Sequence, residues 1–206
     1  MIRLIANWIM FRRANMLADR LLPFLPAQGL IADVGAGTGH NAVVLRQRSE
    51  CKIRQWDVAD MHWVGEGAEP IPDDFKTPFL AGQSVQCVLL IYVLQYPKDA
   101  ASLLNWILNE EPQQLLVMQS TYRNLWGKFV FRVQEAIFGP MAFYLARLFR
   151  LVPHQKCSVN PVRYFRAADM VDLLNGSGLQ VCHVQAHSNW LLGTGSDLFV
   201  CRRETA

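Results

Sequence analysis

The chain has 206 residues, of which 51% are hydrophobic and 18% are charged, and its formal net charge at pH 7 is +3. This length suits a single domain with a substantial buried core, and the apolar balance excludes a mainly disordered chain. The cations are spread along the sequence instead of forming one block. Because sequence-independent binding to nucleic acid needs a concentrated basic face, we expect no nucleic-acid partner.

The cysteines and the apolar N-terminal segment indicate in which cellular compartment the protein is found. The cysteine number is odd and no two cysteines form a CxxC pair, so we expect free thiols and neither disulfides nor zinc at Cys51, Cys87, Cys157, Cys182 and Cys201. Residues 1–11 are largely apolar and Arg12 and Arg13 follow them, which reverses the order of a signal peptide. No window has the ~18 uninterrupted apolar residues of a membrane span. We therefore expect a cytoplasmic protein, with membrane association as the alternative.

Apolar runs and helical spacing alternate along the chain. A first helix is expected over residues 2–25, until Pro23 and Pro26 end it. Further helices are expected at 41–48, 100–108 and 166–175, and strands at 30–34, 52–58, 85–94, 114–119, 179–186 and 198–203. Residues 60–77 are expected to be mostly loop, so that a third strand is reduced or missing. The alternation predicts a parallel sheet covered on both faces.

The loop after the first strand has the composition of a nucleotide cradle. Residues 30–34 run into Gly35-Ala36-Gly37-Thr38-Gly39, and a helix follows. Glycine permits the sharp turn and the close approach of a ligand, at which the free N–H groups of the helix start point. A dinucleotide fingerprint, G-x-G-x-x-G, would need its third glycine where His40 stands. Asp33 precedes the loop, and a carboxylate there favours a cationic ligand over a pyrophosphate.

The segment Asp33-Val34-Gly35-Ala36-Gly37-Thr38-Gly39 resembles the first motif of class I S-adenosylmethionine-dependent methyltransferases. The resemblance covers residues 28–120 and continues more weakly to the end of the chain. It implies an α/β fold with a doubly wound, mostly parallel Rossmann-like sheet of six to seven strands, an antiparallel last strand and helices on both faces. The chain would form one methyltransferase domain, with a helical cap at 1–27 and a helical insertion or lid at 123–165.

The resemblance also implies which residues hold S-adenosylmethionine. An acid and a glycine loop hold the methionine end of the cofactor in this family, and the matching residues are Asp33, Gly35, Ala36, Gly37 and Gly39. Asp57, followed by Val58, matches the acid that binds the ribose hydroxyls. Asp74 and Phe75 match an element near the adenine, and Ile91 lies in the strand that resembles the family's fourth. The alternatives are a helix or turn cap for Asp33, a turn residue for Asp57 and a solvated loop carboxylate for Asp74.

The chemical step needs few specialised side chains. Methyl transfer is an in-line displacement that depends on positioning and on exclusion of water, and a general base helps only when an acceptor proton must leave early. The candidate catalytic residues are Tyr92, near the C-terminal end of the fourth strand, and His40, at the start of a helix. Other polar groups expected at strand ends are Tyr96, Ser120, Thr121 and Tyr122. The histidines lack metal-ligand spacing, so we expect no metal site.

Residues 125–152 interleave aromatic side chains with Lys128, Arg132, Arg147 and Arg150. Three interpretations of this segment remain open: a lid over an apolar pocket, a segment that lies on a membrane surface, or ordinary core helices. Together with the apolar first helix this segment favours a small hydrophobic or aromatic acceptor for the methyl group. The alternatives are a membrane-surface lipid or quinone methyltransferase, a non-catalytic cofactor-binding scaffold and, less in keeping with Asp33 and His40, a nicotinamide oxidoreductase.

Overall fold

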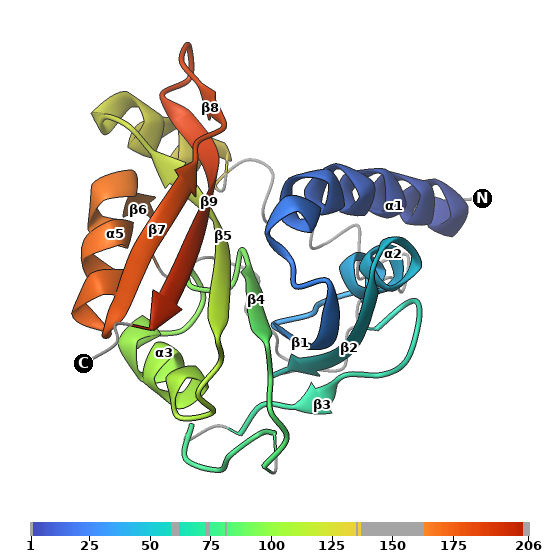
Figure 1. Cartoon of the computed structure of the whole chain (residues 1–206). Coiled ribbons are helices and arrows are strands. Elements are labelled where there is room, and N and C mark those ends of the chain that lie inside the picture. The colour runs from blue at the N-terminus through green and yellow to red at the C-terminus, as the bar shows by residue number, and fades with distance from the viewer. Residues whose placement is uncertain are drawn as a thin grey trace.

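A computed structural model of the chain describes residues 2–58, 62–72, 75–80, 82–134, 136 and 163–203. In chain order its elements are α1 (Ile2–Leu21), the 3₁₀ turn η1 (Leu22–Phe24), β1 (Gln28–Val34), α2 (His40–Arg48), β2 (Glu50–Asp57), β3 (Glu69–Pro70), β4 (Cys87–Ile91), α3 (Ala100–Leu108), β5 (Gln114–Tyr122), β6 (Phe165–Arg166), α5 (Ala167–Gly176), β7 (Leu179–Gln185), β8 (Ser188–Asn189) and β9 (Thr194–Arg203) (Figure 1). Residues 125–134 are also helical. No helix in these described ranges is long and apolar enough to cross a membrane.

The strands form one nine-stranded sheet, in which seven follow the order β3-β2-β1-β4-β5-β9-β7 while the short β6 pairs with β5 and the short β8 with β9. Neighbouring strands from β3 to β5 are parallel, whereas β9 is antiparallel to both β5 and β7. The expected mostly parallel sheet with an antiparallel last strand is therefore confirmed. After β1 the chain builds outward to β3 and then returns to place β4 on the other side of β1. In open α/β sheets the crevice at such a reversal, beyond the carboxyl ends of the strands, is where ligands bind.

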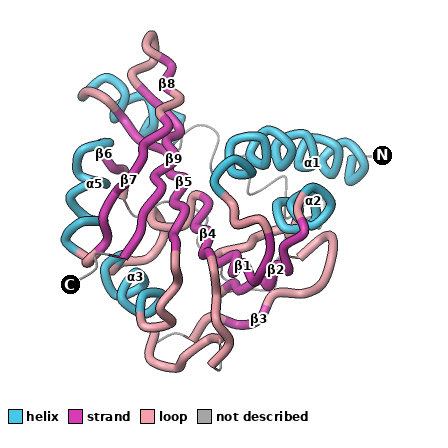
Figure 2. The backbone as a smooth tube through the Cα atoms, in the orientation of Figure 1, coloured by secondary structure: helices cyan, strands magenta, loops and turns pink. Residues whose placement is uncertain are grey.

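Helices cover both faces of the sheet, and each face has its own apolar core (Figure 2). On one face α1 and α2 pack against alternate side chains of the central strands through Ala14, Leu17, Ala18, Leu21, Ala42, Val44 and Leu45. On the other face α3 and α5 pack through Leu103, Leu104, Trp106, Ile107, Met170 and Leu174. Because successive residues of a buried strand point to opposite faces, continuous apolar runs such as β4 serve both cores.

Several element boundaries differ from the expectation, for local reasons. The strand expected over 85–94 is limited to Cys87–Ile91, because Tyr92 has a φ of +59° and leaves the extended region. Strands β5 and β9 are longer than expected, because they pair continuously from the Leu115 and Cys201 pair to the Tyr122 and Thr194 pair. The stretch 60–77 contains β3, a reduced third strand of two residues.

The expected lid at 123–165 lies only partly within the described residues. A helix occupies 125–134, whereas 137–162, with Cys157, Arg147 and Arg150, falls outside the described ranges. The cap predicted at 1–27 consists of α1 and η1, and α1 lies against α2. Of the described cysteines, Cys182 is exposed on β7 although it lies within an apolar stretch of sequence.

Candidate functional site

The glycine loop lies at the reversal point of the sheet, between β1 and α2. Gly35 N and Ala36 N both donate hydrogen bonds to Trp56 O at the end of β2, at 2.7 and 3.1 Å. Gly35, Gly37 and Gly39 all have positive φ, at +78°, +57° and +84°. Glycine adopts this region without the steric cost of a Cβ, which explains why the chain can turn so sharply here.

The three glycines differ in what lies beside them. A Cβ added to Gly35 would come within 2.4 Å of Val93 Cγ2, and one added to Gly39 within 2.4 Å of Val64 O. These two glycines therefore allow the protein to pack closely against its own loop. A Cβ on Gly37 would meet no described atom within 4 Å. At Gly37 the loop faces open space, where a ligand can approach the backbone.

Two carboxyl groups lie beneath the loop. Asp33, at the carboxyl end of β1, is 1% exposed, and its Oδ2 is buried without a hydrogen-bond partner among the described residues. Burial, and then the charge of Asp57, raise the Asp33 pKa to about 7, and Arg46 opposes that rise. Asp57 ends β2, and its Oδ2 accepts a hydrogen bond from Gly37 N at 2.6 Å.

This arrangement selects the charge of a ligand. A buried carboxylate without a partner is costly, and a second carboxylate nearby adds like-charge repulsion. A cationic group placed at Asp33 would offset both costs, whereas a pyrophosphate would add to the repulsion. Perturbed pKa values of this kind cluster at functional sites. The residues present therefore fit a cationic ligand lying over Gly37, and S-adenosylmethionine, with its ammonium and sulfonium, has this charge.

His40 connects the loop to α1. It is 2% exposed, and Nδ1 lies 2.9 Å from Thr38 Oγ1 while Nε2 lies 2.6 Å from Asn7 Oδ1. Phe11 of α1 packs edge-on to the imidazole with ring centroids 4.7 Å apart. Burial first, and the charge of His62 second, lower the His40 pKa. Both ring nitrogens of a neutral His40 are thus used in holding α1 to the loop.

Tyr92 begins the segment after β4 and contacts three parts of the chain. Its backbone N donates to Met118 O of β5 at 2.7 Å. Its hydroxyl lies 2.6 Å from Ser196 Oγ of β9, and the Arg13 guanidinium of α1 lies 5.0 Å from the centre of its ring. Arg20 Nη1 in turn lies 3.2 Å from Ser196 Oγ, within hydrogen-bond range.

The other residues predicted to bind the cofactor have no hydrogen bond to the glycine loop among the contacts of the described residues. Val58 is 68% exposed, directly after Asp57. Ile91 is buried at the end of β4, beside the crevice. Phe75 has a φ of +50° and packs against the Trp106 ring, with centroids 5.8 Å apart. Asp74 lies outside the described residues.

The polar groups predicted at the end of β5 have mixed surroundings. Thr121 Oγ1 donates to Asp197 Oδ2 at 2.6 Å, and Tyr122 is buried with Lys128 Nζ 5.7 Å from its ring centre. Tyr96 is partly exposed.

The sequence did not predict four polar residues near the site, namely Asn7, Ser196 and the hydrogen-bonded pair Gln95 and Gln119. Gln119 Nε2 donates to Gln95 Oε1 at 2.8 Å, and Gln119 Oε1 is buried with no hydrogen-bond partner in the described part of the chain. Polar residues at strand ends were the available signal, but their partners lie far away in sequence.

Comparison with solved structures identifies the fold. No protein-family model and no curated protein matches the sequence. Among solved structures, the fold is similar to magnesium protoporphyrin IX methyltransferase from Synechocystis PCC 6803 with bound S-adenosylhomocysteine, at a TM-score of 0.56 and 15% identity over 94% of this chain and 83% of that one.

Two further structures widen the comparison. A chain of the complex between the Haloferax volcanii Trm112 methyltransferase activator and a methyltransferase matches at a TM-score of 0.62 and 14% identity over 97% of both chains. A [4+2]-cyclase matches at 0.61 and 11% identity, over 95% of this chain and 81% of that one. The chain thus has the α/β fold of class I methyltransferases, and this fold also carries other chemistry.

Proposed function

We propose that the chain binds S-adenosylmethionine at the glycine loop and transfers its methyl group to a small hydrophobic or aromatic molecule. The observation that carries this proposal is the buried Asp33 carboxyl, whose Oδ2 has no partner among the described residues, beside an open Gly37. The ammonium of S-adenosylmethionine would supply the charged hydrogen-bond partner that Asp33 Oδ2 lacks among the described residues. A structure of the same fold with bound S-adenosylhomocysteine supports the choice of ligand.

Each predicted cofactor residue has a role in this proposal. Asp33 would hold the ammonium, the backbone of Gly35, Ala36, Gly37 and Gly39 would lie along the methionine end, and Asp57 would bind the ribose hydroxyls. Val58, Asp74, Phe75 and Ile91 would surround the adenine. When bound, the cofactor supplies an electrophilic methyl group on a positively charged sulfur. The chain's own task is to fix the acceptor in line with that methyl and to exclude water.

The acceptor side is proposed to be formed around Tyr92. Its ring lies between β4, β9 and α1, and the hydrogen bond to Ser196 keeps the hydroxyl in one orientation. We propose that Tyr92 touches the acceptor, as a wall or a hydrogen-bonding group. His40 is retained as a second candidate, although hydrogen-bond partners on both ring nitrogens favour a positioning role.

The first test is calorimetric titration with S-adenosylmethionine and S-adenosylhomocysteine, with NAD as a control ligand. We expect micromolar binding of both sulfur compounds and none of NAD. Asp57→Ala should lose most of that binding, whereas Asp172→Ala, an exposed acid on α5, should bind as the parent protein does. Binding of NAD in place of the sulfur compounds would indicate an oxidoreductase. Binding without methyl transfer to any acceptor would favour the non-catalytic scaffold.

A further inference from the structure

Three segments of the chain expose large apolar side chains. On α1 these include Trp8 at 62% exposure, on the helix 125–134 Trp126 at 55%, and between β8 and β9 Trp190 at 87%. The whole set is Leu4, Ile5, Trp8, Ile9, Met16, Leu125, Trp126, Phe129, Val133, Trp190 and Leu191. Single exposed apolar residues are ordinary, but a set that includes three tryptophans indicates an interaction surface.

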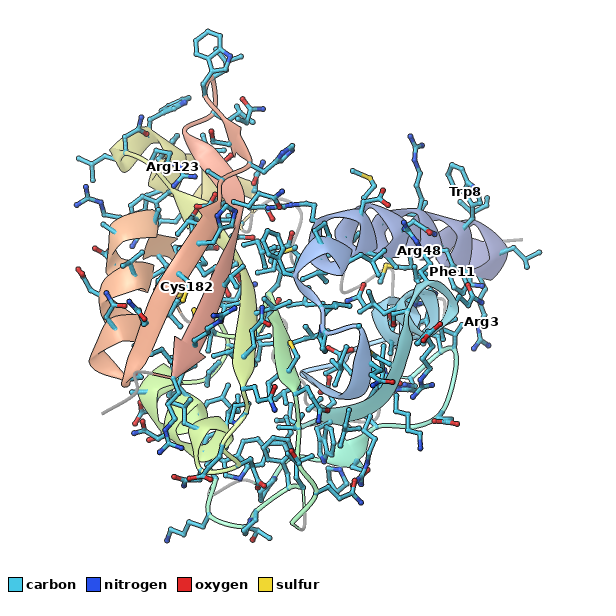
Figure 3. The ribbon with its side chains drawn as sticks, in the orientation of Figure 1. Arg3, Trp8, Phe11, Arg48, Arg123 and Cys182 are labelled. Carbon is cyan, nitrogen blue, oxygen red and sulfur yellow. The ribbon has the colours of Figure 1, made fainter. Side chains whose placement is uncertain are left out.

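The apolar outer face of α1 does not serve the protein core. Residues 4, 5, 8, 9, 12 and 16 recur at helical spacing on one side of the helix, and all of them except Arg12 are apolar. The opposite side, with Ala14, Leu17 and Leu21, packs against the sheet. Figure 3 shows Trp8 directed away from the sheet. The core therefore accounts for one face of α1 and leaves the other unexplained.

Hydrogen bonds and close packing join the three segments. Arg20 Nη2, near the end of α1, donates to Ser196 O at 2.8 Å, at the base of the β8–β9 hairpin. Arg123 N donates to Gly193 O in the same hairpin at 2.8 Å. A Cβ on Gly127 would come within 1.9 Å of that carbonyl, so the helix 125–134 begins directly against the hairpin. In Figure 1 all three lie in the upper half of the view.

The charged side chains of the two helical segments are mostly cationic. Residues 2–18 and 125–134 carry Arg3, Arg12, Arg13, Lys128 and Arg132 but no aspartate or glutamate. The rest of the chain has 15 of the 20 cations and all 17 carboxylates, so its formal charge is negative. On α1 the Arg12 guanidinium lies 5.7 Å from the centre of the Trp8 ring, so cation and aromatic share the outer face.

We propose that α1, the helix 125–134 and the β8–β9 tip form a docking surface for an anionic lipid bilayer. Apolar and aromatic side chains would enter the boundary between headgroups and acyl chains, while the arginine and lysine side chains would meet lipid phosphates. The single carboxylate of α1, Asp19, pairs with Arg48 at 2.7 Å, and the helix 125–134 has none, so the cationic excess of the two helical segments favours an anionic surface over a neutral one. A second protein or a second copy of this chain would bury the same apolar groups without needing this charge pattern.

The docking surface adjoins the proposed acceptor side. Ser196 holds both Arg20 of α1 and the hydroxyl of Tyr92, so Tyr92 lies behind the surface that would face the lipid. An acceptor dissolved in the bilayer would reach Tyr92 without crossing water. This consequence rests on the proposed methyl transfer, whereas the docking itself does not.

The test is flotation of the protein with vesicles of phosphatidylcholine alone or of phosphatidylcholine mixed with phosphatidylglycerol. We expect binding to the anionic vesicles that declines with added salt. The triple variant Leu4→Ser/Trp8→Ser/Ile9→Ser should bind at least tenfold more weakly, because all three side chains are exposed and the core does not need them. Arg12→Gln, which removes the cation beside Trp8, should weaken binding about fivefold.

Matched controls separate this effect from general surface changes. Val184→Ser removes an exposed apolar side chain on β7, and Arg202→Gln removes an exposed cation on β9, and neither should change vesicle binding. An unchanged far-UV circular dichroism spectrum and thermal unfolding midpoint for every variant show independently that the fold persists. No binding to anionic vesicles, or binding that the triple variant leaves unchanged, would overturn the proposal. A self-association abolished by the triple variant, without vesicle binding, would assign the surface to a second copy.

Discussion

Asp33 is fully buried with a pKa raised to about 7, first by burial and second by the charge of Asp57. The ligand-free protein at pH 6 therefore holds a proton on about nine-tenths of its Asp33 carboxyls. A cationic ammonium placed beside Asp33 favours the ionised form and expels that proton. Binding of S-adenosylmethionine should consequently release about 0.9 proton at pH 6 and about 0.5 at pH 7, with affinity about fivefold higher at pH 7.

The assay is calorimetry of S-adenosylmethionine binding at both pH values, in two buffers of different ionisation enthalpy. Asp33→Asn removes the titrating group and nearly conserves the shape. This variant should bind about 10- to 100-fold more weakly at pH 7, as expected when a hydrogen bond to a charged group is lost. Its binding should release no proton between pH 6 and 7. Proton release that persists in Asp33→Asn, or none in the parent protein, would refute the link between Asp33 and the ligand.

The same group affects the stability of the ligand-free protein, and the sign is determined by the raised pKa. In the unfolded chain Asp33 has the ordinary aspartate pKa of 3.8, whereas burial in the folded protein raises its pKa to about 7. The protonated Asp33 therefore stabilises the folded protein relative to the ionised form. This stabilisation is fully present below the unfolded-state pKa and is lost as the pH rises through the folded-state pKa, and the loss in unfolding free energy is about 4 kcal/mol. Denaturant unfolding from pH 4 to 7 should therefore show a decline that is smaller in Asp33→Asn.

Three further changes are informative. Gly37→Ala should lose at least tenfold in affinity for S-adenosylmethionine in calorimetry but cost only about 1–2 kcal/mol in denaturant unfolding. Gly178, which also has a positive φ and open surroundings, gives the control: Gly178→Ala should cost about the same stability and leave binding intact. Tyr92→Phe should keep cofactor affinity within about twofold and lower the rate of methyl transfer once an acceptor is known, and an unchanged rate would remove Tyr92 from the chemistry. Asp197→Ala should lower unfolding free energy by about 3–5 kcal/mol, because Asp197 accepts hydrogen bonds from Thr121 and Arg123 in a fully buried position, and a loss below 1 kcal/mol would contradict that account.

The fold could be predicted from the sequence because its local signals agree with one another. The apolar run of β1, the glycines after it and the helix α2 occur in the order that a strand, a tight turn and a helix require. The boundaries of α3 were also predicted correctly, since Asp99 caps its first turn through hydrogen bonds to Ala101 N and Ser102 N.

Features that depend on distant residues could not be predicted in this way. Tyr92 interrupts an apolar run that continues to Leu94, and nothing local to it indicates a positive φ. The extension of β5 depends on its pairing with β9, where Ser120 pairs with Ser196 and Tyr122 with Thr194, 76 and 72 residues later in the chain. The role of Asn7 as a partner of His40 appears only when α1 lies across the loop.

In the site, too, local features could be predicted from the sequence and features that depend on distant residues could not. The charge preference of the loop could be predicted from Asp33 because the residue directly precedes the glycines. That its Oδ2 is buried without a partner in the described part of the chain follows only from the packing of β1 between β2 and β4. The acceptor side could not be assembled from the sequence, because Arg13, Tyr92 and Ser196 come from three separate elements.

The most direct test of the central claim is a crystal structure of the protein grown with S-adenosylhomocysteine. The account predicts the ligand over Gly37, with its ammonium at Asp33 and its ribose hydroxyls at Asp57. A ligand bound elsewhere, or a loop that remains empty at saturating concentration, would contradict the assignment of this crevice as the cofactor site.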